Sequence, residues 1–247
     1  MQSSADQKTY GMFATAANRK LVRELESDGA KVFQFQAIKT EKMILDKTAI
    51  AYLQNLADFD WIILPDVLTV DYFLQALEEV GIDFFELDVV RVCALGEAVA
   101  DRLRFVQLHA DLIPNFVETE SVFTSLSNFI SQSKLENLRF LLPKEIFSSV
   151  EVTKKLTENK AIVTELAIYQ ATISDKREVS KLKTLLKGGA IDEFIFSSPT
   201  DLISMKYIFS DVSISEILAE TKISATDEIM FQALKEYNLK PKICRIK

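Results

Sequence analysis

Small polar residues at the end of one apolar run are the clearest candidates for chemistry in this chain. Ser197, Ser198 and Thr200 follow the run Phe194–Phe196 and precede a stretch with helical spacing. The first turn of a helix has backbone N–H groups without partners, and its dipole favours negative charge, so these residues are suited to bind carboxylates of a ligand. The alternative is that they only cap the helix, since serine is a common N-cap residue.

A glycine marks a second turn of the same kind. Gly96 follows the apolar run Val89–Leu95 and comes directly before Glu97, the first residue of another expected helix. Glycine lets a ligand approach the backbone closely, and it also tolerates the backbone angles of tight turns. Gly96 and Glu97 are therefore candidates for ligand binding, and a turn without a ligand is the alternative.

The chain lacks the patterns of the common catalytic and cofactor sites. It has no GxGxxG or GxxxxGK[ST] phosphate loop and no GxSxG turn. Its single histidine, His109, lies in an alternating apolar stretch and is expected to be structural. Cys93 and Cys244 have no metal-like spacing; reduced thiols are the simpler interpretation and a disulfide is the alternative. We therefore expect no metal and no cofactor.

The sequence also repeats itself weakly over a long distance. Three stretches recur in the same order about 131 residues later: residues 25–38 at 156–169, residues 60–64 at 192–196, and residues 94–104 at 225–235. This period is too long for a solenoid repeat, so it indicates two similar domains. A cleft between the domains is the expected ligand site, because small-molecule sites usually lie in clefts.

Strands and helices alternate along both halves. Apolar runs such as Trp61–Leu64 and Leu138–Leu142 are typical of strands that are buried on both faces. Helical spacing follows most of these runs, as in Val70–Val80, which Gly81 ends. This alternation predicts α/β domains in which a parallel sheet is doubly wound, with helices on both faces.

Four further segments complete the expected order of elements. Ile44–Ala57 and Ser149–Leu156 are expected to be helices, and Phe105–His109 is expected to be a strand. Ile214–Leu218 is compatible with either a helix or a strand.

Composition excludes several classes of protein. The chain has 247 residues, 48% of them hydrophobic, which is enough for two cores. Its net charge of −7 argues against nucleic-acid binding, which favours basic surfaces. No apolar run is long enough to cross a membrane, and the first residues do not resemble a secretory signal. A cytoplasmic monomer is the expectation.

Five motifs occur in the order and spacing of one known family. They are Leu25–Phe35 (a helix end, Gly29 and a strand), Leu95–Leu103 (LGEAVADRL), Ala167-Ile168-Tyr169, Phe196–Thr200 (FSSPT) and Leu239-Lys240-Pro241. Through them the chain resembles the uroporphyrinogen-III synthase family over nearly its full length. It departs from the family at some hydroxyl positions. Asp66 stands within the family's first Thr-Ser-Pro motif, and Val99 and Met230 stand where the family has threonine.

The resemblance implies a particular domain organisation. One domain is expected to contain residues 1–37 together with 174–247, and the other residues 43–166. Extended linker strands at residues 38–42 and 167–173 are expected to join them.

The resemblance also implies a reaction that needs no cofactor. Family members act on hydroxymethylbilane, a linear tetrapyrrole that carries several carboxylates. They release its hydroxyl as water, invert the last pyrrole ring through a spiro intermediate and close the ring, which makes them cyclising lyases. The enzyme mainly holds the substrate in a reactive shape. Tyr169 is expected to help the hydroxyl leave, since a phenol donates a hydrogen bond and stays protonated at neutral pH. Packing in the hinge is its alternative role.

Substrate binding is expected from Ser197, Ser198, Thr200, Gly96, Glu97 and Asp66. Asp66 lies at the equivalent turn of the other half, where it either faces away from the substrate or caps a helix. Two other functions stay open. One is a degenerate homologue that binds a tetrapyrrole or a protein without catalysis. The other is a two-domain small-molecule binding protein of another family, because a fold alone does not define a function.

Overall fold

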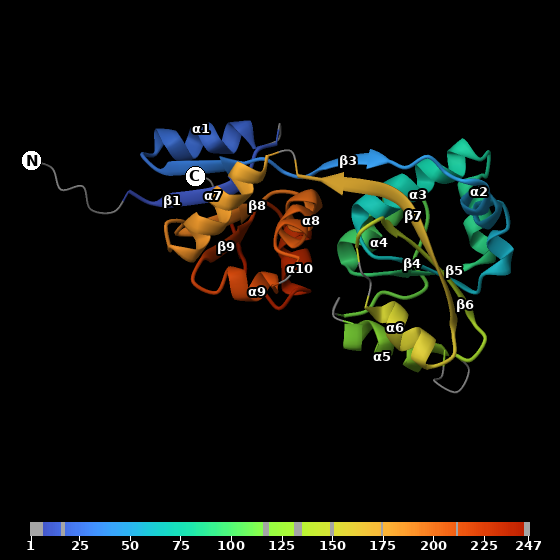
Figure 1. The fold of residues 1–247 in the computed structure, drawn as a ribbon. Helices are drawn as coiled ribbons and strands as arrows, with labels where there is room; N and C mark the ends of the chain where they lie inside the picture. Colours follow the sequence, from blue (N-terminus) through green and yellow to red (C-terminus); the bar gives the residue numbers. More distant parts are fainter. Residues whose placement is uncertain are drawn as a thin grey trace, which may run out of the picture. The chain divides into compact units, whose positions relative to one another are not determined.

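The chain divides into two compact units in the computed structural model (Figure 1). The first unit comprises residues 1–39 and 172–247, and the second unit comprises residues 40–171. The structure describes residues 7–15, 18–115, 119–130, 135–148, 151–173, 175–210 and 212–244. Within these ranges, no helix is both long and apolar enough to cross a membrane.

The first unit is built on a five-stranded sheet in the order β10-β9-β8-β1-β2. Its elements are β1 (Thr9–Phe13), α1 (Arg19–Ser27), β2 (Lys31–Phe35), α7 (Lys176–Lys187), β8 (Glu193–Phe196), α8 (Pro199–Ile208), α9 (Ile214–Ile217), β9 (Lys222–Ala225), α10 (Glu228–Lys235) and β10 (Lys242–Ile243). Neighbouring strands pair in parallel throughout. Counted within the unit, the strand order is 2-1-3-4-5, which is a doubly wound order.

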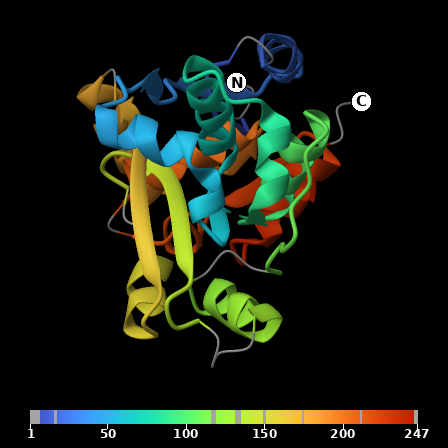
Figure 2. The same cartoon turned by 90° about the vertical axis from the view of Figure 1, so that its right-hand side faces the viewer.

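The second unit is built on a sheet in the order β3-β7-β6-β4-β5. Its elements are β3 (Lys39–Lys42), α2 (Lys47–Gln54), η1 (Leu56–Asp58), β4 (Trp61–Leu64), α3 (Val67–Glu79), η2 (Phe84–Val89), β5 (Arg91–Ala94), α4 (Glu97–Phe105), α5 (Thr119–Ile130), β6 (Arg139–Glu145), α6 (Val152–Glu158) and β7 (Ile162–Thr172). The strands β4 to β7 pair in parallel, and Figure 2 shows β6 and β7 side by side. The edge strand β3 runs opposite to β7 (Figure 1).

The repeated stretches of sequence correspond to equivalent strands of the two sheets. They relate β7 to β2, β4 to β8 and β5 to β9. Strand β6 corresponds to β1 at nearly the same sequence offset. With these equivalences, the order β5-β4-β6-β7 of one sheet is the order β9-β8-β1-β2 of the other. The predicted fold class, two similar doubly wound α/β domains, is confirmed.

The central strand of the second unit is buried on both faces, as its apolar run predicts. Ile62 and Leu64 pack with residues of α3 and α4 on one face of the sheet. Trp61 and Ile63 pack with residues of α5 and α6 on the other face. None of these four side chains is more than 1% exposed. Burial on both faces explains why the run shows no alternation of polar and apolar residues.

An aspartate before the central strand of each sheet explains part of the repeat. The Asp60 carboxylate accepts a hydrogen bond from Arg139 N at 2.7 Å, at the start of the neighbouring strand β6. The Asp192 carboxylate accepts one from Thr9 N at 2.7 Å, at the start of β1. Each aspartate therefore fixes the beginning of the two middle strands of its sheet.

Two sequence expectations need correction. Phe105–His109 is not a strand: Phe105 is the last residue of α4, and Gln107 has a φ of 63° in the turn that follows. The expected helix over Ile44–Ala57 is shorter, because Asp46 caps α2 and η1 follows it. Strand β9 was not predicted. The expected helix Ser149–Leu156 begins outside the described residues, and its described part, α6, starts at Val152.

Candidate functional site

Several candidate residues lie at the carboxyl edge of the sheet in the second unit. Asp66 follows β4, Gly96 follows β5, Glu145 ends β6, and Tyr169 lies opposite Glu145 on β7. In doubly wound sheets, ligands bind outside the carboxyl ends of the strands, where the strand order reverses. That point lies between β4 and β6 here, so this edge is the candidate site of the unit.

The phenol of Tyr169 faces the Asp66 carboxylate. Its oxygen lies 3.4 Å from both Oδ1 and Oδ2 of Asp66. Tyr169 is 1% exposed, and its ring stacks on that of Tyr72 at 4.8 Å between centroids and an interplanar angle of 11°. The Tyr72 hydroxyl donates to Thr40 Oγ1 at 2.9 Å on the edge strand β3. The stacked ring and its anchored hydroxyl hold the phenol of Tyr169 in place.

Burial and charge keep Tyr169 protonated. Burial raises the pKa of the phenol most, and the negative charge of Asp66 raises it further. The buried carboxylate of Glu145 acts in the same direction. The phenol therefore keeps its proton at neutral pH, as proton donation by Tyr169 requires.

Asp66 is the N-cap residue of α3. Its Oδ1 accepts a hydrogen bond from Thr69 N at 2.7 Å. Of the two roles that we expected, the capping role is present, and the same carboxylate also contacts Tyr169. Aspartate caps a helix as well as serine does, so the replacement of a hydroxyl residue preserves the local fold while adding a charge.

Glu145 was not among the predicted site residues. It is 5% exposed, and its carboxylate accepts hydrogen bonds from Ala171 N at 3.1 Å and from Phe147 N at 2.7 Å. These bonds tie the irregular end of β6, where the register shifts between Lys144 and Glu145, to the end of β7. No motif identifies Glu145, because its partners are backbone groups and one of them is distant in sequence.

Gly96 and Glu97 form the turn that begins α4. Gly96 is the N-cap residue and has a φ of 106°, a conformation that favours glycine. Glu97 forms an ion pair at 2.7 Å with Arg104, which lies about two turns later on the same helix. This bond raises the pKa of the Arg104 guanidinium. The turn role of Gly96 is thus present, and ligand binding by both residues stays a prediction.

In the first unit, the serines at the start of α8 surround a carboxylate of the chain itself. Asp201 Oδ2 accepts hydrogen bonds from Ser197 N and Ser197 Oγ, both at 2.8 Å, and from Ser198 N at 3.2 Å. The Ser198 hydroxyl lies 3.0 Å from Asp201 Oδ1 and accepts from Asp201 N at 3.3 Å, which completes a capping box. The capping alternative therefore describes Ser198.

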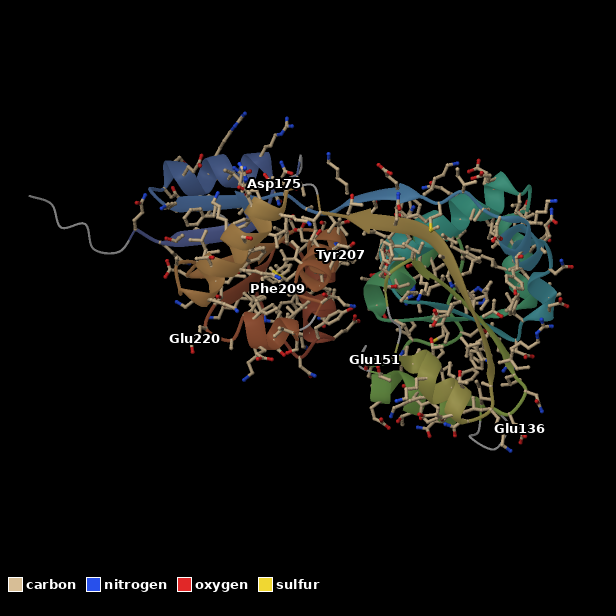
Figure 3. All side chains as sticks on the ribbon, in the orientation of Figure 1. Glu136, Glu151, Asp175, Tyr207, Phe209 and Glu220 are labelled. Atoms are coloured by element: carbon tan, nitrogen blue, oxygen red, sulfur yellow. The ribbon has the colours of Figure 1, made fainter. Side chains whose placement is uncertain are left out.

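The Asp201 carboxylate changes what this turn offers to an anion. Asp201 is fully buried, and burial raises its pKa although the serine hydrogen bonds oppose the shift. Two of the amides that we expected to bind a ligand carboxylate already have an acceptor. Thr200, which follows Pro199 in the first turn, is half-buried and retains its predicted role as a proposal. Side-chain caps also begin other helices. Figure 3 shows Asp175 at the start of α7, where its carboxylate accepts a hydrogen bond from Arg177 N at 2.8 Å.

A cavity of about 930 Å³ lies at the opposite edge of the sheet in the second unit. Asp60, Arg91, His109, Asp111 and Phe129 are among its lining residues, and none of the predicted site residues lines it. Its position at the amino ends of β4 and β5 separates it from the candidate site.

The described residues hold no cluster of three or more histidine, cysteine or acidic side chains suited to a metal ion. Both cysteines are free thiols. Burial raises the pKa of Cys93 to about 12, so this thiol is a poor nucleophile at neutral pH.

These features define a class of protein: two doubly wound α/β units of the same strand order, with polar turns at the carboxyl edges of their sheets. The family model of uroporphyrinogen-III synthase HemD matches residues 19–245. The chain belongs to the uroporphyrinogen-III synthase family, a family of cyclising lyases in tetrapyrrole biosynthesis, as its motifs predicted.

Similar proteins agree with this assignment. Over 220 residues, the chain is 20% identical to a porphyrin biosynthesis protein HemD of Ruminiclostridium josui and 22% identical to a uroporphyrinogen-III synthase of Chlorobaculum parvum. These matches cover 89% of the chain in both cases. The chain spans 42% of the length of the first relative and 85% of the second. The crystal structure of uroporphyrinogen III synthase from Thermus thermophilus superposes with a TM-score of 0.64 at 18% identity, covering 95% of this chain and 90% of that one, so the fold is shared.

Proposed function

We propose that this protein is an active uroporphyrinogen-III synthase. It converts hydroxymethylbilane into uroporphyrinogen III with loss of one water. The bond between the hydroxymethyl carbon and its oxygen breaks, the oxygen leaves with an added proton, and the pyrrole nitrogen stabilises the resulting cation. The α-carbon of the last ring that already carries a bridge bonds the cationic carbon, which gives a spiro intermediate. The older bridge bond then breaks, the freed and now cationic bridge carbon bonds the unsubstituted α-carbon of the inverted ring, and that carbon loses a proton.

The observation that carries this proposal is the buried phenol of Tyr169 at the carboxyl edge of its sheet. It is protonated, held by the stacked ring of Tyr72, and placed where doubly wound sheets bind ligands. A phenol in this state can donate a hydrogen bond to the leaving hydroxyl. The substrate supplies both reacting carbons, so positioning and one donor suffice.

The identity of the product tests this proposal. Hydroxymethylbilane closes spontaneously to the symmetric type I isomer, and only a synthase yields the type III isomer. The protein is added to a reaction that generates hydroxymethylbilane, and the isomers are separated after oxidation to porphyrins. Type III product in proportion to added protein is the expected result. Type I as the sole product would refute the proposal.

A degenerate homologue that binds a tetrapyrrole without catalysis is the second candidate. It is favoured by two carboxylates of the chain at turns that were expected to bind substrate carboxylates. Asp201 occupies the amides of Ser197 and Ser198, and Asp66 caps α3. Under this alternative, added uroporphyrin binds and quenches the intrinsic fluorescence of the protein, but no type III isomer is formed.

The proposed setting of the enzyme is the cytoplasm, as a monomer that binds neither nucleic acid nor a membrane. The net charge of −7 supports the absence of nucleic-acid binding. Sedimentation at several concentrations measures the mass directly. A mass of about one chain at all concentrations is expected, and a concentration-dependent increase would contradict the monomer.

A further inference from the structure

The contact between Asp66 and Tyr169 determines what the phenol can offer to a ligand. An ionised carboxylate only accepts hydrogen bonds, and a phenol has a single proton to donate. While Asp66 is ionised, a bond between the two groups must use the phenolic proton. The same proton is the one that a leaving hydroxyl requires.

The hydrogen-bond geometry allows the charge of Asp66 to decide which group receives the phenolic proton. The two O···O distances of 3.4 Å exceed the roughly 2.5–3.0 Å of strong O–H···O bonds, so the contact is weak. A protonated Asp66 can instead donate to the phenol oxygen, and the phenolic proton then becomes available to another acceptor. The charge state of Asp66 therefore selects the direction of the hydrogen bond.

The other groups around the phenol leave this choice to Asp66. Glu145 from β6 bonds two backbone N–H groups. Tyr72 from α3 donates its proton to Thr40. The hydroxyl of Thr69, also on α3, is fully buried beside the phenol and lowers its pKa, as a donor to the phenol oxygen does. Among the carboxylates of the described residues, that of Asp66 is the one within hydrogen-bond distance of the phenol.

We propose that Asp66 is a positioning residue that sets the hydrogen-bond direction of Tyr169. The phenol donates toward a bound ligand when Asp66 carries a proton and donates to Asp66 when that carboxylate is ionised. This inference deepens the proposed function, on which its kinetic test rests. The structural part of the inference concerns the free protein and can be tested without turnover.

The substitution Asp66→Asn separates this role from helix capping. Asparagine caps a helix as well as aspartate does, so the bond from Thr69 N is retained. Its amide nitrogen donates to the phenol oxygen at every pH, which imitates the protonated aspartate. Asp46→Asn is the matched control. Asp46 caps α2 of the same unit through Ala49 N at 2.7 Å, in the same way that Asp66 caps α3.

The first experiment measures the hydrogen bond of Tyr169 without substrate. The chemical shift of its Cζ carbon is recorded by NMR in the full chain between about pH 4 and pH 9, with ¹³C-labelled tyrosine assigned through Tyr169→Phe. One titration step is expected in the wild type and in Asp46→Asn, and none in Asp66→Asn. A flat wild-type curve overturns the inference. A step that survives in Asp66→Asn overturns it too, because another group then determines the hydrogen bond of the phenol.

The second experiment measures kcat for type III product across the same pH range. The wild-type kcat is expected to fall about tenfold per pH unit above the NMR transition, since one ionisation removes the donor. Asp66→Asn is expected to show no such fall and to exceed the wild type at high pH. Adding Tyr169→Phe is expected to abolish this gain. If kcat of Asp66→Asn is lower with an unchanged pH profile, Asp66 is only a structural cap and the inference is wrong.

The two experiments distinguish a failure of the proposed function from a failure of this inference. If no variant forms type III product, the proposed function is refuted, and the NMR titration still decides whether Asp66 orients the phenol. Urea unfolding of both Asp→Asn variants verifies that they are folded. A less stable Asp66→Asn protein with the expected NMR result still supports the inference, because the control variant measures the cost of the lost cap charge.

Discussion

At the scale of single residues, the buried phenol of Tyr169 makes the sharpest prediction. Tyr169→Phe removes the hydroxyl and keeps the ring that stacks on Tyr72. We expect kcat for type III product to fall by about tenfold to a hundredfold, because proton donation to the leaving oxygen is lost. KM is expected to change little, since the ring stays in place. Steady-state kinetics of the purified variant measure both constants.

Tyr72→Phe is the matched control for this substitution. It removes a hydroxyl from the neighbouring ring, where that hydroxyl bonds Thr40 instead of Asp66. Its kcat is expected to be closer to the wild-type value than that of Tyr169→Phe. Equal rates for Tyr169→Phe and the wild type would remove Tyr169 from the mechanism.

The buried carboxylate of Asp201 predicts a pH dependence of stability. Its pKa is raised above the usual 3.8, so the folded state binds more protons than the unfolded state between these two values. The free energy of unfolding therefore decreases as the pH rises through this window. Asp201→Asn cannot titrate, so we expect its stability curve to lack this decrease. Urea unfolding of both proteins at several pH values from about 3.5 upward measures the difference in slope.

A parallel displacement of the two stability curves would contradict this prediction, because it would show that Asp201 titrates equally in both states. The loss of acceptors for the serine hydrogen bonds is expected to lower the stability of Asp201→Asn at neutral pH. Ser213, whose side chain caps the short helix α9 from the surface, offers a comparison as Ser213→Ala.

Single residues differ in how well the sequence predicts their contacts. Ser198 and Asp201 form a capping box three residues apart, and the pattern Ser-x-x-Asp before an apolar stretch is a known signal that our sequence analysis did not use. Asp66 was placed at a helix start from its position after a strand. Its contact with Tyr169 joins residues more than 100 positions apart, and no local pattern encodes such a contact.

At the scale of elements, the pairing of β1 with β8 depends on a glycine. Gly11 lies opposite Phe194, and a Cβ atom at Gly11 would lie 2.8 Å from Phe194 Cδ2 and 3.1 Å from two methyl groups of Ile191. The corresponding pair in the second unit is Leu141 opposite Ile62. Small and large residues are thus combined differently in the two sheets to fill the same space.

This difference in volume predicts an effect of Gly11→Ala. The added methyl group overpacks the face of the sheet that holds Phe194, and we expect a loss of about 1–3 kcal/mol in the free energy of unfolding. The double variant Gly11→Ala with Phe194→Leu is expected to recover part of this loss, since the smaller side chain makes room. Denaturant unfolding of the three variants measures it, and a strictly additive loss would contradict the packing argument.

Elements with a strong periodic signal were predicted well, and weak ones were not. Trp61–Leu64 is a run of four apolar residues between Asp60 and Pro65, and its bounds agree with β4. Phe105–His109 alternates like a strand, but the preceding helix continues through Phe105 and ends in a left-handed turn at Gln107. β9 (Lys222–Ala225) is as short as β4 but contains Lys222 and Ser224, so it has no continuous apolar run that would indicate a buried strand.

At the scale of the whole molecule, the division of the chain predicts unequal behaviour of its parts. The second unit is contiguous over residues 40–171 and has apolar clusters on both faces of its sheet. We expect a fragment of these residues to unfold cooperatively on its own, with a midpoint in urea similar to that in the full chain. Circular dichroism and tryptophan fluorescence of Trp61 measure the transition.

The first unit is made of two segments, and neither contains the whole sheet. Residues 1–39 supply β1 and β2, and residues 172–247 supply β8, β9 and β10. Each segment alone is expected to be unfolded. A linked fragment in which residue 247 is joined to residue 1 through a flexible linker is expected to fold. A folded fragment of residues 172–247 alone would show that the central pairing of β1 with β8 is dispensable.

The order in which the ribosome releases these segments imposes a delay on folding. β1 ends at Phe13, whereas its inner partner β8 begins only at Glu193. At synthesis rates of about 5–20 residues per second, the nascent β1 waits on the order of 10 s or more for that partner. The apolar side chains of Met12 and Phe13, which the finished sheet buries completely, lack the packing of β8 during this interval. In nascent chains of this protein, β1 therefore is an apolar segment that a chaperone can bind.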